Sequence, residues 1–141
     1  MHDRCFLYSL AFHFNKRFLK NVQDYKIFEE IISRHNWDLT GVSFPISIEG
    51  IKTFLKQNPD LKININIFAM NRIIIKNKEK YHIFPYKTGL GQGGETINLL
   101  VVKNFESTTN VVSHFFYIKN LPLFIAKRYG KKGIQSSIQK F

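Results

Sequence analysis

Residues 62–68 read KININIF, and this stretch marks the point where the pattern of the chain changes. Ile63, Ile65 and Ile67 alternate with two asparagines, and this period of two predicts a β-strand with one buried face. Before Pro59 the apolar residues recur at helical spacing, whereas after it they recur at strand spacing. The change of period therefore divides the chain into a helical first part and a mainly β second part.

Three helices are predicted before this strand. The first runs from Cys5 to about Lys20 and is apolar on most of its sides, and the second follows Asp24 and is amphipathic. The third lies between Ser47 and the Asn-Pro pair at 58–59, which ends it. Asp24 and Ser47 are suited to N-capping because their side-chain oxygens can accept hydrogen bonds from the first turn of a helix.

Three further strands and a short helix are predicted after residue 68. YHIFPY (81–86) contains a proline and suits an edge strand, whereas INLLVV (97–102) is continuously apolar and suits a central one. HFFYIKNL (114–121) is its expected hairpin partner, and PLFIAKRYG (122–130) has the proline and glycine that start and end a helix. N-terminal helices, an antiparallel sheet meander and a short C-terminal helix together predict an α+β fold.

The composition indicates one globular domain. The chain has 141 residues, of which 44% are hydrophobic and 15% aromatic, enough to bury a core. We expect a domain over 1–129 and a basic, flexible tail over 130–141. No apolar run is long enough to cross a membrane, and one cysteine excludes an internal disulfide and a Cys-based zinc site. We expect no metal, no cofactor, no membrane partner and an intracellular location, nuclear or cytoplasmic.

The net charge is +11, and its distribution along the chain is uneven. After residue 118 there are six basic residues and no acidic one, a composition that favours a polyanionic partner, most simply nucleic acid. A solvated basic tail is the alternative, since no recognised binding motif accompanies the charges. The predicted nucleic-acid-binding residues are Lys119, Lys127, Arg128, Lys131 and Lys132.

The stretch GLGQGG (89–94) formally satisfies the spacing G-x-G-x-x-G. A dinucleotide site of this kind needs a helix after the glycines, and here the pattern predicts a strand. A kinase glycine loop lies between strands, but no catalytic-loop motif follows in this chain. We therefore interpret the stretch as a flexible connection.

The single cysteine is a candidate nucleophile. With Asp3 as N-cap, Cys5 would lie in the first turn of a helix, where the helix dipole and a neighbouring histidine can lower a thiol pKa. Of the five histidines, His114 opens the strand beside the central one, on a rigid element. The alternative is that the cysteine fills the core and the histidine is structural.

The order of these parts resembles that of papain-like peptidases, and most of all their ovarian-tumour (OTU) type. HDRCF (2–6) is similar to the acidic loop that leads into the catalytic cysteine of that family, and INLLVV with HFFYI (114–118) is similar to its closing hairpin. The resemblance implies a papain-like fold in which Cys5 is the nucleophile and His114 the general base. Asn98 or Asp3 would orient the histidine, and the substrate would be a ubiquitin-like protein or a polyprotein peptide.

A second resemblance covers residues 3–125. DRCFLYSLAF (3–12), GVSFPISIEGIKTFLKQNPDLKININIF (41–68) and HFFYIKNLPLFI (114–125) are similar to the region before the polymerase in protein-primed family B DNA polymerases of Polinton (Maverick) transposable elements and related adintoviruses. This implies an OTU-like, deubiquitinase-like cysteine peptidase domain, active or inactive, from a virus-derived polymerase protein. The alternatives are a non-catalytic, basic DNA-binding accessory module of such a polymerase and a relic reading frame. Polymerase or exonuclease activity is not expected, because the acidic metal-binding clusters are missing.

Overall fold

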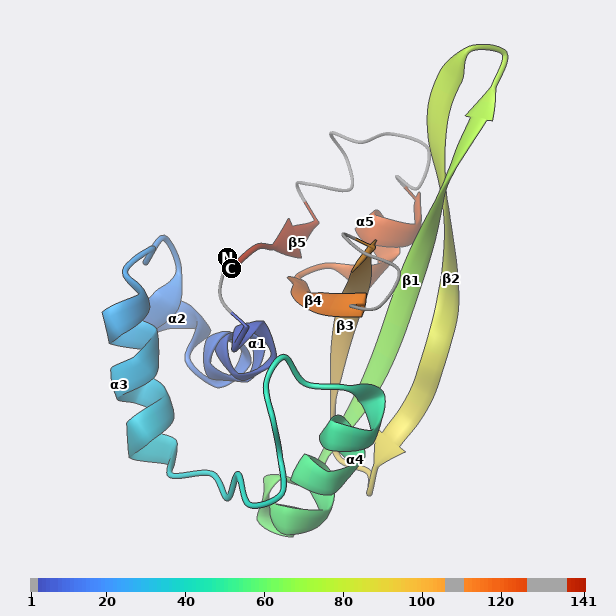
Figure 1. Ribbon diagram of the computed structural model, residues 1–141. Helices are drawn as coiled ribbons and strands as arrows, with labels where there is room; N and C mark the ends of the chain where they lie inside the picture. Colours follow the sequence, from blue (N-terminus) through green and yellow to red (C-terminus); the bar gives the residue numbers. More distant parts are fainter. Residues whose placement is uncertain (1–2, 106–110, 127–136) are drawn as a thin grey trace.

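The computed structural model describes residues 3–105, 111–126 and 137–141. Helices and strands form an α+β structure in which α1, α3 and α4 lie on one side of a sheet and α5 packs on the other (Figure 1). The elements, in chain order, are α1 (Cys5–Phe14), α2 (Lys16–Leu19), α3 (Tyr25–His35), α4 (Ile48–Gln57), the 3₁₀ helix η1 (Pro59–Leu61), β1 (Ile63–Ile75), β2 (Lys78–Gly91), β3 (Glu95–Phe105), β4 (Val111–Ile118), α5 (Leu121–Ala126) and β5 (Ile138–Gln139).

The sheet is mixed, with the strand order β2-β1-β3-β4-β5. β1 and β2 form an antiparallel hairpin, β3 pairs with β1 in parallel, and β4 is antiparallel to β3. The prediction of an antiparallel meander is therefore wrong at the β1–β3 pair. The expectations of a central strand at 97–102, an edge strand containing 81–86 and a β3–β4 hairpin are confirmed.

The parallel pair exists because the chain crosses the start of β1 in the short turn between β2 and β3. Gly91 has φ +117°, and a Cβ added there would lie 2.1 Å from the Ile63 carbonyl oxygen. Gly94 has φ +109°, and a Cβ there would lie 2.0 Å from the Lys62 carbonyl oxygen. Only glycine fits both the backbone conformation and the close approach. The glycine-rich stretch is thus a tight structural crossing, which the interpretation as a flexible connection missed.

β1 and β2 are longer than the sequence pattern indicated, with 13 and 14 residues. Their far ends form an arm that extends beyond the rest of the sheet (Figure 1). The arm closes through Lys76 and Asn77, both with positive φ, as a type I′ hairpin turn requires. Along β2 the register slips next to Pro85, and this irregularity suits a proline in an edge strand.

Helix α1 is the central element of the larger core. Nine of its ten residues are buried, and the first predicted helix ends earlier than expected, because Asn15 separates α1 from the short α2. The N-cap of α1 is Arg4, not Asp3, and forms no side-chain cap hydrogen bond. The predicted caps of α3 and α4 are confirmed, since Asp24 and Ser47 accept backbone hydrogen bonds at 3.0 Å each.

Residues 137–141 belong to the folded domain. Ile138 is buried in β5, which pairs with β4, and the Phe141 ring contacts Tyr8, Phe12 and Phe28 with centroids 5.5–6.2 Å apart. The prediction of a flexible tail over 130–141 is wrong for this final segment, while 130–136 lie outside the described residues. Among the described residues, no helix has the length and apolar character required to span a membrane.

We expect Gly91→Ala to destabilise the fold more than Gly89→Ala. Both substitutions place an alanine at positive φ, which costs about 1–2 kcal/mol. Gly89 has nothing within 4 Å of an added Cβ, whereas Gly91 faces the Ile63 backbone, and relieving that overlap costs roughly 1–3 kcal/mol more. Urea unfolding followed by Trp37 fluorescence measures the difference. Equal losses in the two variants would contradict the crossing geometry.

Candidate functional site

Cys5 lies in the first turn of α1, packed against strand β4. Its side chain is in the core, with 2% of the residue exposed, and its Sγ accepts a hydrogen bond from the Phe115 N–H at 3.1 Å. The fold therefore brings the first turn of α1 to the strand that carries His114, although 110 positions separate the two bonded residues.

The His114 side chain lies on the other face of β4. Phe115 packs in the core that contains Cys5, whereas Phe116 packs on the face covered by α5. Side chains alternate along a strand, so His114 shares the face of Phe116, and the two rings meet edge to face with centroids 4.8 Å apart. Within the described residues, no hydrogen bond of 4.0 Å or less joins Cys5 Sγ to the His114 ring.

Burial sets the protonation of both groups. It raises the pKa of the Cys5 thiol, an effect that the hydrogen bond from Phe115 opposes. It lowers the pKa of His114, an effect that a hydrogen bond to the Phe141 backbone opposes. Both shifts favour the neutral forms, thiol and imidazole. Since a cysteine attacks as the thiolate, burial opposes formation of the nucleophile, whereas the neutral imidazole keeps the form that can accept a proton.

The residues expected to orient His114 lie elsewhere. Asn98, half-buried on β3, accepts a hydrogen bond from the Asn66 side chain of β1 at 3.3 Å. Val102 is the residue of β3 opposite His114. Asn98 precedes Val102 by four positions, which separates the two along the strand by about 13 Å. Asp3 is exposed, and its charge raises the pKa of the Cys5 thiol further. Asn98 is thus placed to pair the strands rather than to orient the histidine.

Of the predicted nucleic-acid-binding residues, only Lys119 is described, and it is exposed directly after β4. The other four, Lys127, Arg128, Lys131 and Lys132, lie outside the described residues.

A buried polar cluster, which the sequence analysis did not identify, joins α1 to the sheet. His13 is 8% exposed, and its Nδ1 lies 2.8 Å from the Tyr117 hydroxyl. Its Nε2 lies 2.8 Å from a carboxylate oxygen of Glu95. Because a carboxylate only accepts, the neutral ring carries its proton on Nε2, and Tyr117 donates to Nδ1. Burial lowers the pKa of His13, and the Glu95 charge opposes this shift.

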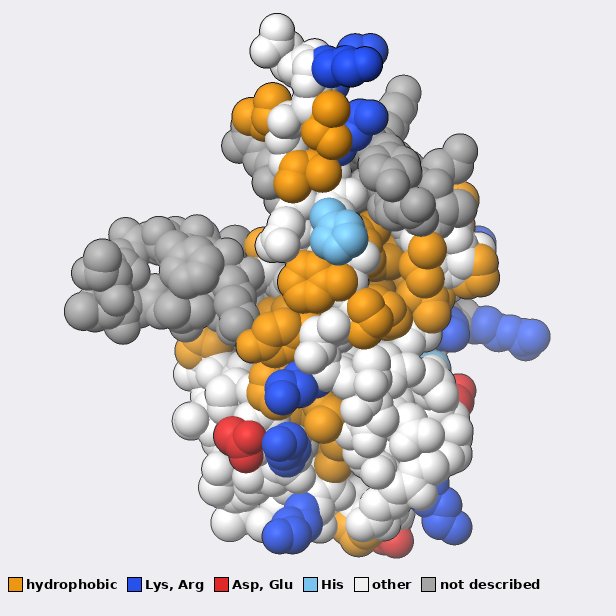
Figure 2. All heavy atoms as spheres, turned by 90° about the vertical axis from the view of Figure 1, so that its right-hand side faces the viewer, with side chains coloured by type: hydrophobic (Ala, Val, Ile, Leu, Met, Phe, Trp, Pro, Cys, Tyr) orange, Lys and Arg blue, Asp and Glu red, His pale blue; other side chains and the backbone are white. Residues whose placement is uncertain are grey.

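An aromatic and basic strip on β2 also went unrecognised in the sequence. The rings of His82 and Phe84 stack with centroids 5.9 Å apart and planes 22° apart, and Tyr86 is 36% exposed. Exposed lysines, Lys78 and Lys87, lie on the two sides of these rings along the strand. Figure 2 shows hydrophobic side chains along this side of the molecule, with lysine or arginine side chains at both ends. The signal was the interleaving of lysines and aromatics in KEKYHIFPYK (78–87).

Within the described ranges, no three or more His, Cys, Asp and Glu side chains gather into a set that could hold a metal ion. Comparison of the chain with models of protein families, with curated proteins and with solved structures finds no match.

We expect the folded state to lose stability as the pH falls through about 6.5, because His13, His35 and His114 all have lowered pKa values. The unfolded chain then binds protons that the folded chain does not. Each histidine whose pKa is lowered by folding therefore stabilises the folded state above its unfolded pKa, and this contribution is lost as the pH falls below that pKa. His13→Asn keeps a partner for Tyr117 but does not titrate. The free energy of unfolding at pH 7.5 and 5.5 should differ by roughly 1 kcal/mol less in this variant than in the wild type. An unchanged difference would contradict the lowered pKa of His13.

Proposed function

We propose that this protein is a non-catalytic module that binds single-stranded nucleic acid along β2. One observation carries the proposal: the exposed edge strand presents His82, Phe84 and Tyr86 between Lys78 and Lys87. Proteins that hold single strands without reading their sequence combine aromatic rings, on which bases stack, with cations that follow the phosphates. β2 has both features on one exposed element.

The charge distribution supports this placement. Residues 1–61 contain eight Lys and Arg against seven Asp and Glu, whereas residues 62–141 contain thirteen against three. The excess of positive charge therefore belongs to the half of the chain that begins with β1. A field of one sign over that half attracts a polyanion and steers its approach.

The aromatic rings favour a single strand over a duplex. Rings stack on the faces of bases, and those faces are accessible only when the bases are unpaired.

The one acidic residue of β2, Glu79, accepts a hydrogen bond from the Tyr81 hydroxyl at 2.6 Å. In a polymerase protein of the kind that the sequence resembles, such a module would hold the template or the product.

Replacing two of the rings should weaken binding to a single-stranded oligonucleotide. Base stacking contributes roughly 1–3 kcal/mol per ring, so we expect His82→Ala with Tyr86→Ala to raise the Kd by about tenfold or more. Fluorescence anisotropy with a labelled single strand measures the Kd. Phe18→Ala is the matched control, because Phe18 is a 64% exposed aromatic on α2, away from the strip.

The salt dependence and a duplex control test the same proposal. Log Kd should rise linearly with log salt, with a slope of about 0.7 per neutralised phosphate of a single strand. Three results would each contradict the proposal. They are equal changes of Kd in the control and strip variants, tighter binding of a duplex than of a single strand, and an affinity that does not depend on the salt concentration.

We propose a cysteine peptidase as the second candidate, favoured by the position of Cys5 beside the strand that carries His114. In such a reaction the thiol proton of Cys5 would pass to His114, and the resulting thiolate would attack a carbonyl carbon. His114 would then protonate the leaving amine. The Phe115–Cys5 hydrogen bond must first open, and the imidazole must reach the side of β4 on which the sulfur lies.

A ubiquitin-derived electrophilic probe tests this second candidate. For a peptidase we expect a covalent adduct on the native chain, seen as a mass shift, which Cys5→Ala abolishes and His114→Ala slows at least tenfold. The denatured chain serves as the control for simple thiol alkylation. Labelling only after denaturation, or equal labelling in His114→Ala, would refute the candidate.

A further inference from the structure

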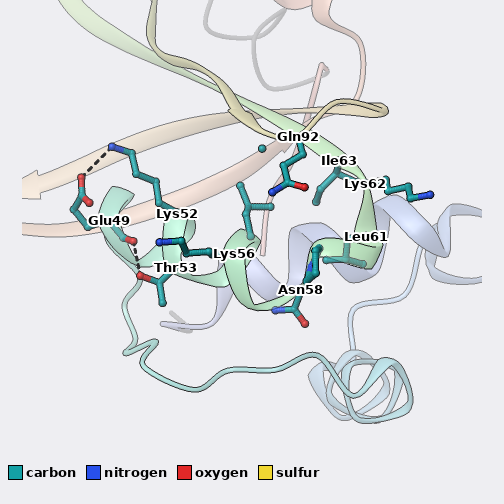
Figure 3. A pocket seen from close by; sticks show the side chains of 12 residues that line it. Glu49, Lys52, Thr53, Lys56, Asn58, Leu61, Lys62, Ile63 and Gln92 are labelled. Atoms are coloured by element: carbon teal, nitrogen blue, oxygen red, sulfur yellow. Dashed lines mark hydrogen bonds and ion pairs between the residues drawn. The ribbon is translucent and has the colours of Figure 1, made fainter.

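A cleft of about 420 Å³ lies at the base of β2, where the strand meets helix α4. Side chains of α4 form one wall, η1 and the start of β1 form the second, and the glycine turn that follows β2 closes the third (Figure 3). Leucine and isoleucine side chains (Leu55, Leu61 and Ile63) add an apolar lining. The cleft is thus built from segments that are separate in the sequence.

The charged groups of this cleft are mainly cations. Lys52 and Lys56 come from α4 and Lys62 comes from the opposite wall, and all three are exposed. The Lys62 ammonium points away from α4 in Figure 3, so Lys62 contributes its charge to the field of the cleft. The only acidic lining residue is Glu49, whose carboxylate is 3.1 Å from the Lys52 ammonium. Three lysines and one glutamate leave an excess of two positive charges, against about half a negative charge from the C-terminal end of α4. The field in the cleft is therefore positive.

The third wall is held firmly in place. Gly91 lines the cleft and lies against the Ile63 backbone, and the Asn64 side chain accepts a hydrogen bond from the Gly93 N–H at 2.8 Å. Between these glycines Gln92 is exposed, and its amide extends toward α4 in Figure 3. The turn thus adds an uncharged donor to the lysines, in a position that the glycine crossing fixes.

Other polar side chains in the cleft are already engaged. Asn58 donates to the carbonyls of Asp38 and Phe54 and accepts from the Asp38 N–H, all at 2.8 Å. Thr53 donates to the Glu49 carbonyl at 3.1 Å. The donors that remain for a ligand are the Lys56 ammonium, the Lys52 N–H groups that Glu49 does not accept from, and the Gln92 amide, and together they suit an oxyanion with several acceptor oxygens.

We propose that this cleft is a phosphate-binding site. A phosphate group offers the acceptors and the negative charge that Lys52, Lys56 and Gln92 match, and Lys62 adds to the positive field. The proposal does not depend on the aromatic strip, but β2 leads from the strip to the cleft, so a strand bound along β2 would bring a phosphate to it. The phosphate therefore belongs either to a nucleic-acid strand or to a free mononucleotide, and both sources share this chemistry.

Titration of the ¹⁵N-labelled full chain with inorganic phosphate, at an ionic strength held constant with chloride, tests the site. We expect saturable amide shifts at residues 91–93 and along α4, and at least tenfold weaker binding in Lys52→Glu with Lys56→Glu. Lys26→Glu, an exposed lysine in the first turn of α3, is the matched control and should bind phosphate as the wild type does. Shifts that do not saturate, or the same affinity in the double variant, would overturn the proposal.

Two further ligands distinguish the source of the phosphate and separate this proposal from the proposed function. A mononucleotide that binds more tightly than inorganic phosphate identifies a free nucleotide as the ligand. A 5′-phosphorylated oligonucleotide that binds at least fivefold more tightly than its unphosphorylated form identifies a strand end. Loss of oligonucleotide binding in His82→Ala with Tyr86→Ala, with phosphate titration unchanged, supports two separate sites. Phosphate binding without any oligonucleotide binding supports the cleft and contradicts the strip.

Discussion

The structure depends on the burial of α1 between the sheet and α3. Nine of its ten residues are removed from water, so every polar group on the helix needs a partner inside the core. Ser9 donates to the Cys5 carbonyl, Cys5 accepts from the Phe115 N–H, and His13 is bonded to Tyr117. Two of these three contacts connect α1 to β4. The packing that places the sulfur beside the histidine strand also buries the thiol, and this burial opposes its ionisation more than the Phe115 hydrogen bond favours it.

Local patterns in the sequence predicted the elements, whereas contacts between distant segments decided how they pair. The caps at Asp24 and Ser47, the alternation of isoleucines in β1 and the apolar run of β3 each express a preference of a few neighbouring residues. The parallel β1–β3 pair depends instead on how closely Gly91 and Gly94 approach the backbone of residues 62–63, and composition does not show that approach. The packing of the final segment was not predicted either, because it depends on contacts of Phe141 with distant residues of α1 and α3.

In the candidate site, too, local sequence patterns pointed to residues, whereas contacts between distant segments decided how their side chains are placed. The sequence identified Cys5 and His114, and the fold does bring α1 to β4, but the alternation of the strand decides which side chain faces the helix, and that is Phe115. His13 was difficult to recognise from the sequence. A helix that is buried on almost all sides has no separate polar face, so a polar residue that is buried does not stand out from the pattern. The strip on β2 was visible in the sequence, yet only the edge position of the strand shows that the alternating lysines and aromatics are accessible, as the proposed binding requires.

The edge position of β2 explains why cations and rings coexist there. An edge strand of 14 residues presents unpaired backbone groups to any other chain, and proteins limit such pairing with lysines, prolines and bulges. β2 has all three, in Lys78, Lys87, Pro85 and the slip in register beside it. A strand protected in this way repels another basic chain of its own kind. In the function that we propose, the phosphates of a polyanion would neutralise the same lysines while its bases would cover the rings. The features that keep the edge from pairing with protein are therefore the same ones on which the proposed binding of nucleic acid depends.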